Sequence, residues 1–371
     1  MTAAAVTFLL QIRACTEFET ALRGSRALLL IPALLVWGCS TIQYYSQSIT
    51  GQLDLMRGAR PVRQVLSDPS TPGGIRQGLE LVQEAREFAR NVMLLSDNGS
   101  YRTYVALQRR FVVWNVFAAP EFSLSPVVWC FPIAGCLNYR GYFHEAQARH
   151  FASSLEHTGM DVYVGGVSAY STLGWFRDPV LNTMLQKSPA ELMKLLLHEL
   201  AHQKLYITGD PDFNEAFAEA VATIGVERWL VGRPPAEADR FRKDQARDDA
   251  VYTLILGAKD ELEGIYRSGF DANVKRTGKH AVAQDLHQRY QEMRRGWQPS
   301  GIYDDWFGGE INNARLAAIS TYRELVPEFL RVFDASGKNL DLFYALANQL
   351  RNCSAAARRR WLQLARIEDG C

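Results

Sequence analysis

Two histidines flank a glutamate in the segment HELAH at residues 198–202. On a helix, residues four apart lie on one face, so His198 and His202 can direct imidazole nitrogens to one metal ion while Glu199 faces a water bound to it. Glu215, thirteen residues after His202, supplies a carboxylate as third ligand. Such a His2Glu set leaves the fourth position of a catalytic zinc ion to a water whose pKa is lowered to about 7. The segment therefore predicts a zinc (Zn2+) hydrolase site with Glu199 as general base.

Two helices must position these groups. Ser188-Pro189-Ala190-Glu191 has the pattern of an N-cap, a proline in the first helical position and a capping-box glutamate, so the first helix should begin near Pro189. This helix is apolar over most of its surface, and we expect it to be buried, with polar partners for its histidines. Gly209 and Asp210 then break the chain, and a second helix from about Pro211 to Leu230 should carry Glu215 in its first turns.

Glu219 competes with Glu215 as third ligand, because it lies one turn further along the same helical face. We favour Glu215, since the Asn214-Glu215 pair resembles the pair that carries the zinc-binding glutamate in thermolysin-like enzymes. Glu219 then either accepts a hydrogen bond from the outer nitrogen of a ligand histidine or lies on the solvated helix surface. A metzincin site is excluded, because Leu205 and Thr208 stand where that class has its glycine and third histidine.

A second region, residues 162–176, precedes the first helix and is rich in β-branched and aromatic side chains, with Gly165 and Gly166 at a bend. This composition predicts a strand pair or one interrupted strand. Its role has two interpretations. It is an edge strand that holds an extended peptide by main-chain hydrogen bonds, or its aromatic side chains complete the core.

The N-terminal region predicts export. Two arginines precede an apolar run at residues 27–38, which suits the h-region of a signal peptide and is shorter than the ~20 residues of a membrane-spanning helix. The run leads into Cys39, in a context that resembles a bacterial lipobox. We expect residues 1–38 to be a signal peptide and residues 39–371 to form a zincin-like metallopeptidase domain, as one core or two closely packed lobes. The expected location is the periplasmic side of a bacterial membrane, in particular the outer membrane, with Cys39 as the lipid anchor.

The net charge and the number of cysteines limit the class of protein further. The chain has 41 basic and 40 acidic residues, and this net charge of +1 gives no electrostatic reason to expect nucleic acid as a partner. Of six cysteines, Cys15 lies in the predicted signal peptide and Cys39 at the lipid site. The remaining even number permits two disulfides in an oxidising compartment. We predict bridges joining Cys130 with Cys136 and Cys353 with Cys371.

The rest of the chain indicates an α+β, helix-dominated fold with a small β-sheet and additional helices around a zincin-like core. Residues 53–109 have the pattern of helices, with a turn at residues 97–100. Residues 111–143 have the pattern of strands and turns, and the chain after Leu230 is again helical.

The chain resembles the putative aminopeptidase family of bacterial lipoproteins, which are zincin-like metallopeptidases with HExxH and a downstream Asn-Glu ligand. The resemblance covers roughly residues 39–326. Besides the HELAH helix, four segments carry it: residues 97–101, 113–122, 139–143 and 170–176. It implies a zinc-dependent aminopeptidase acting on a peptide substrate, and it leaves the identity of that substrate open.

Peptide hydrolysis calls for two further groups. A donor should stabilise the tetrahedral oxyanion, and Tyr322 is our candidate, with Tyr170 and Tyr206 as alternatives. An aminopeptidase also needs an acidic group for the α-ammonium of its substrate. Glu219 and Glu121 are the candidates for that role.

Two other functions remain open. One is an endopeptidase or cell-wall peptide hydrolase that uses the same chemistry. The other is a non-catalytic, lipid-anchored peptide-binding protein in which zinc is structural. A structural zinc site normally has four protein ligands, so a His2Glu set beside Glu199 favours catalysis.

Overall fold

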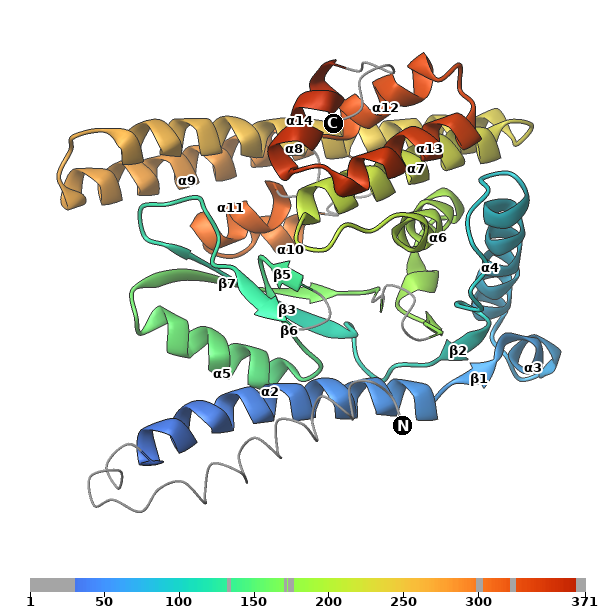
Figure 1. Ribbon diagram of the computed structural model, residues 1–371, viewed down its shortest axis with the longest axis horizontal. Helices are drawn as coiled ribbons and strands as arrows, with labels where there is room; N and C mark the ends of the chain where they lie inside the picture. Colours follow the sequence, from blue (N-terminus) through green and yellow to red (C-terminus); the bar gives the residue numbers. More distant parts are fainter. Residues whose placement is uncertain are drawn as a thin grey trace. The chain divides into compact units, whose positions relative to one another are not determined.

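The computed structural model describes residues 31–131, 135–169, 172, 177–297, 303–320 and 325–364, with side chains from residue 43 onward except at 320 and 364 (Figure 1). The chain divides into two compact units, Met1–Leu53 and Asp54–Cys371. Helix α2 (Ile31–Arg57) runs across this division. The side chain of Cys39, our predicted lipid site, lies outside the described residues. Among the described helices, none combines the length and apolar character that a membrane span requires.

Helices make up most of the second unit, which confirms the helix-dominated α+β class. Its longest elements are a pair of helices that lie side by side along one flank in Figure 1, α8 (Pro235–Arg267) and α9 (Ala272–Arg294). The remaining helices are α3 (Val62–Ser67), α4 (Gly73–Asn91), α5 (Glu145–Glu156), α6 (Pro189–Lys204), α7 (Pro211–Leu230), α10 (Asp304–Phe307), α11 (Asn313–Ser320), α12 (Val326–Ala335), α13 (Leu340–Gln349) and α14 (Ala355–Leu364), with short 3-10 turns at Met184–Gln186 and Leu350–Asn352.

Three small sheets accompany these helices. Strand β3 (Val113–Pro120) is the centre of the largest, between β6 (Arg140–Tyr142) and β7 (Met160–Val167), and pairs antiparallel with both. Helix α5 covers one face of this sheet and α11 the other (Figure 1). The second sheet has the order β1-β2-β8, and β4 and β5 form a hairpin. The bounds of these strands are β1 Arg60–Pro61, β2 Thr103–Val105, β8 Val180–Leu181, β4 Trp129–Phe131 and β5 Gly135–Leu137.

The strands differ in two places from the sequence prediction. Strand β7 passes through Gly165 and Gly166 without interruption and forms one edge strand. A Cβ at Gly166 would stand 2.1 Å from the ring of Phe111, so glycine here permits close packing and does not mark a bend. Strands β1 and β2 lie in the region that was predicted as helices with a turn, because β2 pairs with β8, a partner distant in sequence.

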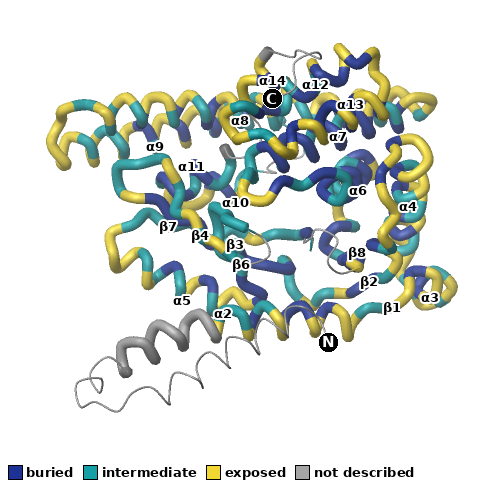
Figure 2. The backbone as a smooth tube through the Cα atoms, viewed as in Figure 1, coloured by how far each residue is buried: buried dark blue, intermediate teal, exposed yellow. Residues whose placement is uncertain are grey.

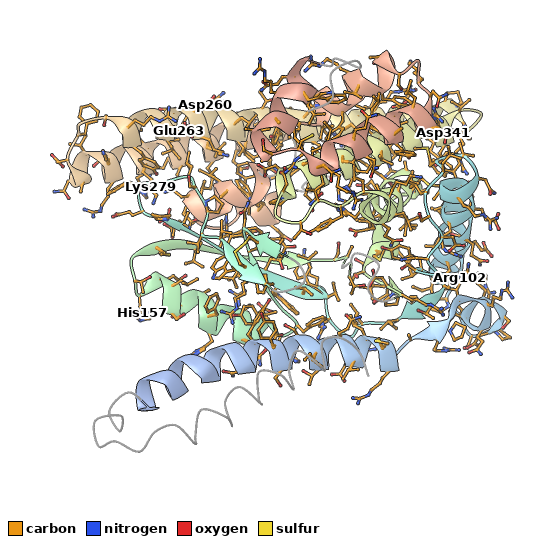
Figure 3. The ribbon with its side chains drawn as sticks, in the orientation of Figure 1. Arg102, His157, Asp260, Glu263, Lys279 and Asp341 are labelled. Atoms are coloured by element: carbon orange, nitrogen blue, oxygen red, sulfur yellow. A yellow bond between two sulfur atoms is a disulfide. The ribbon has the colours of Figure 1, made fainter. Side chains whose placement is uncertain are left out.

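Of residues 162–176, the structure describes 162–169 and 172. Residues 162–167 belong to strand β7, and Ser168, Ala169 and Thr172 lie outside it. Residues 170, 171 and 173–176 lie outside the described residues, so the peptide-holding interpretation of this segment stays a prediction. Lys279 of α9, labelled in Figure 3, contacts the strand itself through Asp161, with Nζ 2.6 Å from Oδ2. This ion pair links the α8–α9 helix pair to the edge of the sheet.

The largest hydrophobic core surrounds α6 and α7 (Figure 2). Helix α7 buries apolar side chains over most of its surface, and Phe217 packs against Phe329 of α12 and Phe343 of α13. A helix buried to this extent has little freedom to shift, because protein interiors are close-packed. The core therefore holds the two helices of the HELAH region in a fixed relation.

The predicted disulfide between Cys130 and Cys136 is confirmed, and it joins strands β4 and β5. Cys353 is also disulfide-bonded. Its predicted partner, Cys371, lies outside the described residues, so the second pairing stays a prediction.

Replacement of Cys130 and Cys136 by serine should lower the free energy of unfolding by about 2 kcal/mol, because the bridge closes only a short loop of the unfolded chain. Urea unfolding of the double variant and of the oxidised wild type measures this difference. Equal unfolding midpoints would show that the bridge contributes nothing to stability.

Candidate metal centre

Helix α6 carries both histidines, and its start is determined by local hydrogen bonds. Ser188 Oγ accepts from the backbone N–H of Glu191 at 3.4 Å, and Glu191 Oε2 accepts from the backbone N–H of Ser188 at 2.9 Å. With Pro189 in the first position, this is the predicted capping box. The helix begins at Pro189 as predicted, and four residues separate His198 from His202 along one face.

Helix α7 brings Glu215 back toward α6. The predicted bounds, Pro211 and Leu230, are confirmed, and Asp210 caps the helix by accepting from the backbone N–H of Phe213 at 3.3 Å. The buried Asn214 accepts from Ile207 N at 2.7 Å and donates to Ile207 O at 2.8 Å. Asn214 thus satisfies the backbone of the connecting loop and places the next residue, Glu215, at the start of the returning helix.

Asn214→Ala should destabilise the protein, since it leaves the backbone N–H of Ile207 without its partner and leaves the carbonyl of Ile207 with only the bond from Asp210 N at 3.2 Å. Each unsatisfied buried group costs about 1–3 kcal/mol, so we expect a loss of about 2 kcal/mol or more in the free energy of unfolding. Denaturant unfolding of the metal-free variant tests this. A variant as stable as wild type would show that water replaces both bonds at no cost.

Two other elements hold the same loop. Arg358 of α14, with a side chain only 8% exposed, forms an ion pair with Asp210 at 2.6 Å. The β4–β5 hairpin approaches from another side, where a Cβ at Gly135 would stand 2.9 Å from Thr208 Cγ2. Gly135 also has φ +75°, a backbone conformation that favours glycine. The loop between the two helices is therefore supported by three separate contacts.

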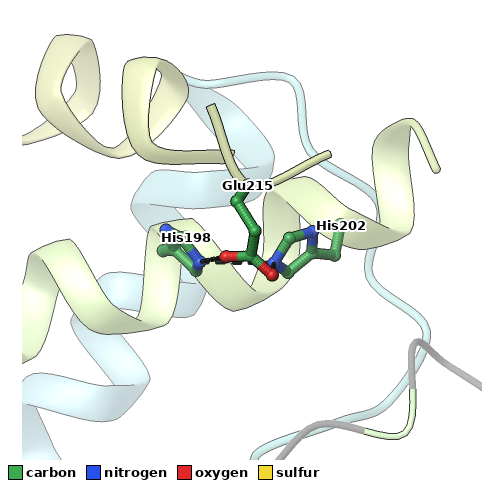
Figure 4. Close-up of side chains that lie close together, drawn as sticks. All are labelled: His198, His202 and Glu215. Atoms are coloured by element: carbon green, nitrogen blue, oxygen red, sulfur yellow. Dashed lines mark hydrogen bonds and ion pairs between the residues drawn. The ribbon is translucent and has the colours of Figure 1, made fainter. Parts of the chain in front are cut away.

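His198, His202 and Glu215 converge on one point (Figure 4). His198 Nε2 lies 3.2 Å from His202 Nε2 and 3.2 Å from Glu215 Oε2. His202 Nε2 lies 3.7 Å from Glu215 Oε1. Three ligand atoms, each about 2.0–2.1 Å from a tetrahedral metal ion, would be about 3.3 Å apart. The observed separations fit this arrangement, so these three residues could hold a metal ion.

The charges at the centre also suit a cation. Burial lowers the pKa of His202 to about 4, so this imidazole is neutral at pH 7 and one of its ring nitrogens carries a lone pair that a metal ion can accept. Burial lowers the pKa of His198 too, but hydrogen bonds with Glu215 and Glu219 outweigh it and raise that pKa to about 10. His198 in the metal-free chain is therefore a proton-carrying cation between two carboxylates, in a place that favours positive charge.

The two histidines differ at their outer nitrogens. His198 Nδ1 lies 3.5 Å from Glu219 Oε2, which places Glu219 where the sequence predicted a partner for a ligand histidine. His202 Nδ1 is buried and has no hydrogen-bond partner among the described residues. Burial raises the pKa of Glu219, but His198 and Lys194 outweigh this and hold the pKa well below its usual range. Glu219 is thus an ionised acceptor beside His198, and it lies outside the three-residue group.

Glu199 is half-buried between the two histidines on α6. Its carboxylate is one cause, after burial, of a pKa of Tyr101 well above the usual range. The side chain of Tyr101 is only 1% exposed, and its hydroxyl has no hydrogen-bond partner among the described residues. Sequence reasoning did not identify Tyr101 as a neighbour of Glu199. The turn at residues 97–100, directly before Tyr101, was predicted. The left-handed backbone of Tyr101 itself, φ 61°, could not be predicted from the sequence, because tyrosine rarely adopts it.

The candidates for the oxyanion donor and for the ammonium-binding carboxylate lie at different places relative to the metal centre. Tyr206 is near the centre, with its ring centroid 6.5 Å from that of His202. Tyr322 and Tyr170 lie outside the described residues. Glu121 does not join the group, because its carboxylate accepts from Arg276 Nε at 2.5 Å at the end of β3. Glu121 pairs with Arg276, and Glu219 pairs with Lys194 and His198, so a role of either carboxylate toward an α-ammonium group stays a prediction.

The family model described as "Putative aminopeptidase" matches residues 43–362, which include α6, α7 and every residue of the metal centre. No curated protein and no solved structure matches the chain. Because the model covers most of the sequence, the chain belongs to the putative aminopeptidase family.

Proposed function

We propose that the protein is a zinc-dependent peptide hydrolase, and specifically an aminopeptidase. The observation that carries this proposal is the convergence of His198, His202 and Glu215 on one point. Glu199 lies in the same helix as the two histidines. Membership of the family supports peptide hydrolysis as the reaction class. The metal centre formed by two consecutive helices, with HExxH on the first and the Asn-Glu pair on the second, also supports a zincin-like core.

Zinc is the ion that this donor set favours. Two imidazole nitrogens and one carboxylate oxygen form one of the three-ligand sets found in catalytic zinc sites. Harder ions such as Mg2+ and Ca2+ prefer sites built from oxygen ligands alone. When bound, zinc supplies a Lewis acid that polarises the scissile carbonyl and increases the acidity of a water molecule.

The side chains of the protein have distinct roles in this proposal. Glu199 removes a proton from the attacking water and delivers it to the nitrogen of the leaving amine. Glu219 accepts from His198 Nδ1 and so keeps His198 in the tautomer that directs Nε2 to the centre. For the oxyanion, Tyr322 remains our candidate donor, and Tyr206 is an alternative that lies beside His202.

Hydrolysis of paired peptides separates the aminopeptidase from an endopeptidase. One peptide has a free N-terminus and the other is the same sequence with an acetylated N-terminus. We expect zinc-dependent release of the first residue from the free peptide and no cleavage of the acetylated one. Internal cleavage of both would favour an endopeptidase or a cell-wall peptide hydrolase. Binding of both peptides without cleavage of either would favour the peptide-binding alternative, in which zinc is structural.

We also propose that the mature chain begins at Cys39 and is lipid-anchored on the periplasmic side of a bacterial membrane. The short apolar run and the lipobox-like residues before Cys39 support this. Mass spectrometry of the N-terminal peptide from membranes should find a lipid-modified Cys39. An unmodified N-terminus at another residue would exclude the anchor.

A further inference from the structure

Lys194 is a lysine on α6, one turn before His198. Its side chain is only 13% exposed, which is unusual for a lysine without a specific role for its charge. Its Nζ lies 2.6 Å from Glu219 Oε1 on α7 and donates to Gln245 Oε1 on α8 at 2.9 Å. The ammonium group is therefore held by two neighbouring helices.

The two oxygens of Glu219 have different partners. Oε1 lies against Lys194, while Oε2 lies 3.5 Å from His198 Nδ1. A carboxylate bound at one oxygen by a fixed cation has little rotational freedom, so its other oxygen stays directed at the imidazole. The result is a chain of contacts from Gln245 through Lys194 and Glu219 to His198.

We propose that Lys194 is a positioning residue for the metal centre, acting through Glu219 to hold His198 in the orientation that binds the ion. Gln245 holds Lys194 from the other side and so connects α8 to the centre. The inference uses the metal site of the proposed function but does not depend on peptide cleavage. Partners behind a ligand histidine typically change metal affinity by about 10–100-fold.

The positive charge of Lys194, considered alone, predicts the opposite change in zinc affinity. Removal of a cation near a metal site weakens the repulsion of the ion, so a lysine without a positioning role would oppose zinc binding and its loss would strengthen it. If Lys194 positions Glu219, its loss weakens zinc binding instead. The sign of the change in zinc affinity therefore distinguishes the two roles.

The experiment is a zinc titration against a competing chelator, with no peptide present, on the full chain. Lys194→Met should raise the zinc dissociation constant about tenfold or more. Lys194→Arg, which keeps the charge and the donors, should stay close to wild type. Lys204→Met is the matched control, because Lys204 is on the same helix and donates to Leu94 O, away from Glu219. This control should not weaken zinc binding.

A double-variant cycle tests whether Lys194 acts through Glu219. Glu219→Gln alone should weaken zinc binding, and adding Lys194→Met to it should have little further effect. Gln245→Leu, which removes one partner of the ammonium, should weaken binding less than Lys194→Met does. This variant keeps the test open if unfolding measurements show that Lys194→Met does not fold.

The inference is overturned if Lys194→Met binds zinc as tightly as wild type or more tightly, or if its effect is the same with and without Glu219. Because the readout is zinc affinity, an absence of peptide cleavage would refute the proposed function and leave this result unaffected.

Discussion

Glu199→Gln should lower kcat for peptide cleavage by about 10²–10⁴-fold while zinc content and peptide affinity stay close to those of wild type. Glutamine preserves the shape of the side chain and cannot accept the proton of the attacking water. Glu199 is not one of the three converging ligand residues, so its replacement should leave the metal in place. Steady-state kinetics, metal analysis and peptide-binding measurements on the same preparation test whether catalysis is lost while zinc and peptide binding remain.

The matched control for this variant is Glu227→Gln, on an exposed turn of α7 where Glu227 pairs with Arg242. It should cleave peptides like wild type, because surface ion pairs contribute little. Equal cleavage by wild type and Glu199→Gln would refute the enzyme function and favour a peptide-binding protein. A loss of zinc in Glu199→Gln would show that Glu199 is instead a metal ligand.

His202→Ala should remove the zinc, from about one ion per chain in wild type to near zero at micromolar concentrations. Alanine takes away one of three protein ligands, and a catalytic zinc site is normally held by three. His202 is only 6% exposed and is one of the three described residues whose ligand atoms converge. Atomic absorption on protein dialysed against a trace of zinc measures the occupancy.

His287→Ala is the control for this second variant. His287 lies on the exposed surface of α9, where Gln291 is its neighbour, and its loss should leave zinc content unchanged. Full occupancy in His202→Ala would contradict the site, and a loss of zinc in both variants would point to general destabilisation.

The parts of the centre that depend on local signals were predicted correctly from the sequence. The capping box at Ser188 and the prolines at positions 189 and 211 fix the starts of α6 and α7, because they act within one helical turn. The spacing of the two histidines then places them on one face. The disulfide between Cys130 and Cys136 also follows from a short sequence separation.

The remaining features depend on contacts between distant segments, which periodicity does not encode. Lys194 has the pattern of an ordinary polar helix position, and only the packing of α7 and α8 against α6 brings Glu219 and Gln245 to its ammonium. Tyr101 approaches Glu199 from a turn far along the chain, with a backbone conformation that tyrosine rarely adopts. Strand β2 was missed for the same reason, because its partner β8 follows it at a distance.

The most direct test of the zinc peptidase proposal is the product profile from an unbiased pool of peptides. The mature chain is incubated with the pool after chelation, after zinc is restored, and as the Glu199→Gln variant. Mass spectrometry should find products shortened by their N-terminal residue only in the zinc-restored wild-type sample. The same products after chelation, or no products in any sample, would contradict a zinc-dependent aminopeptidase.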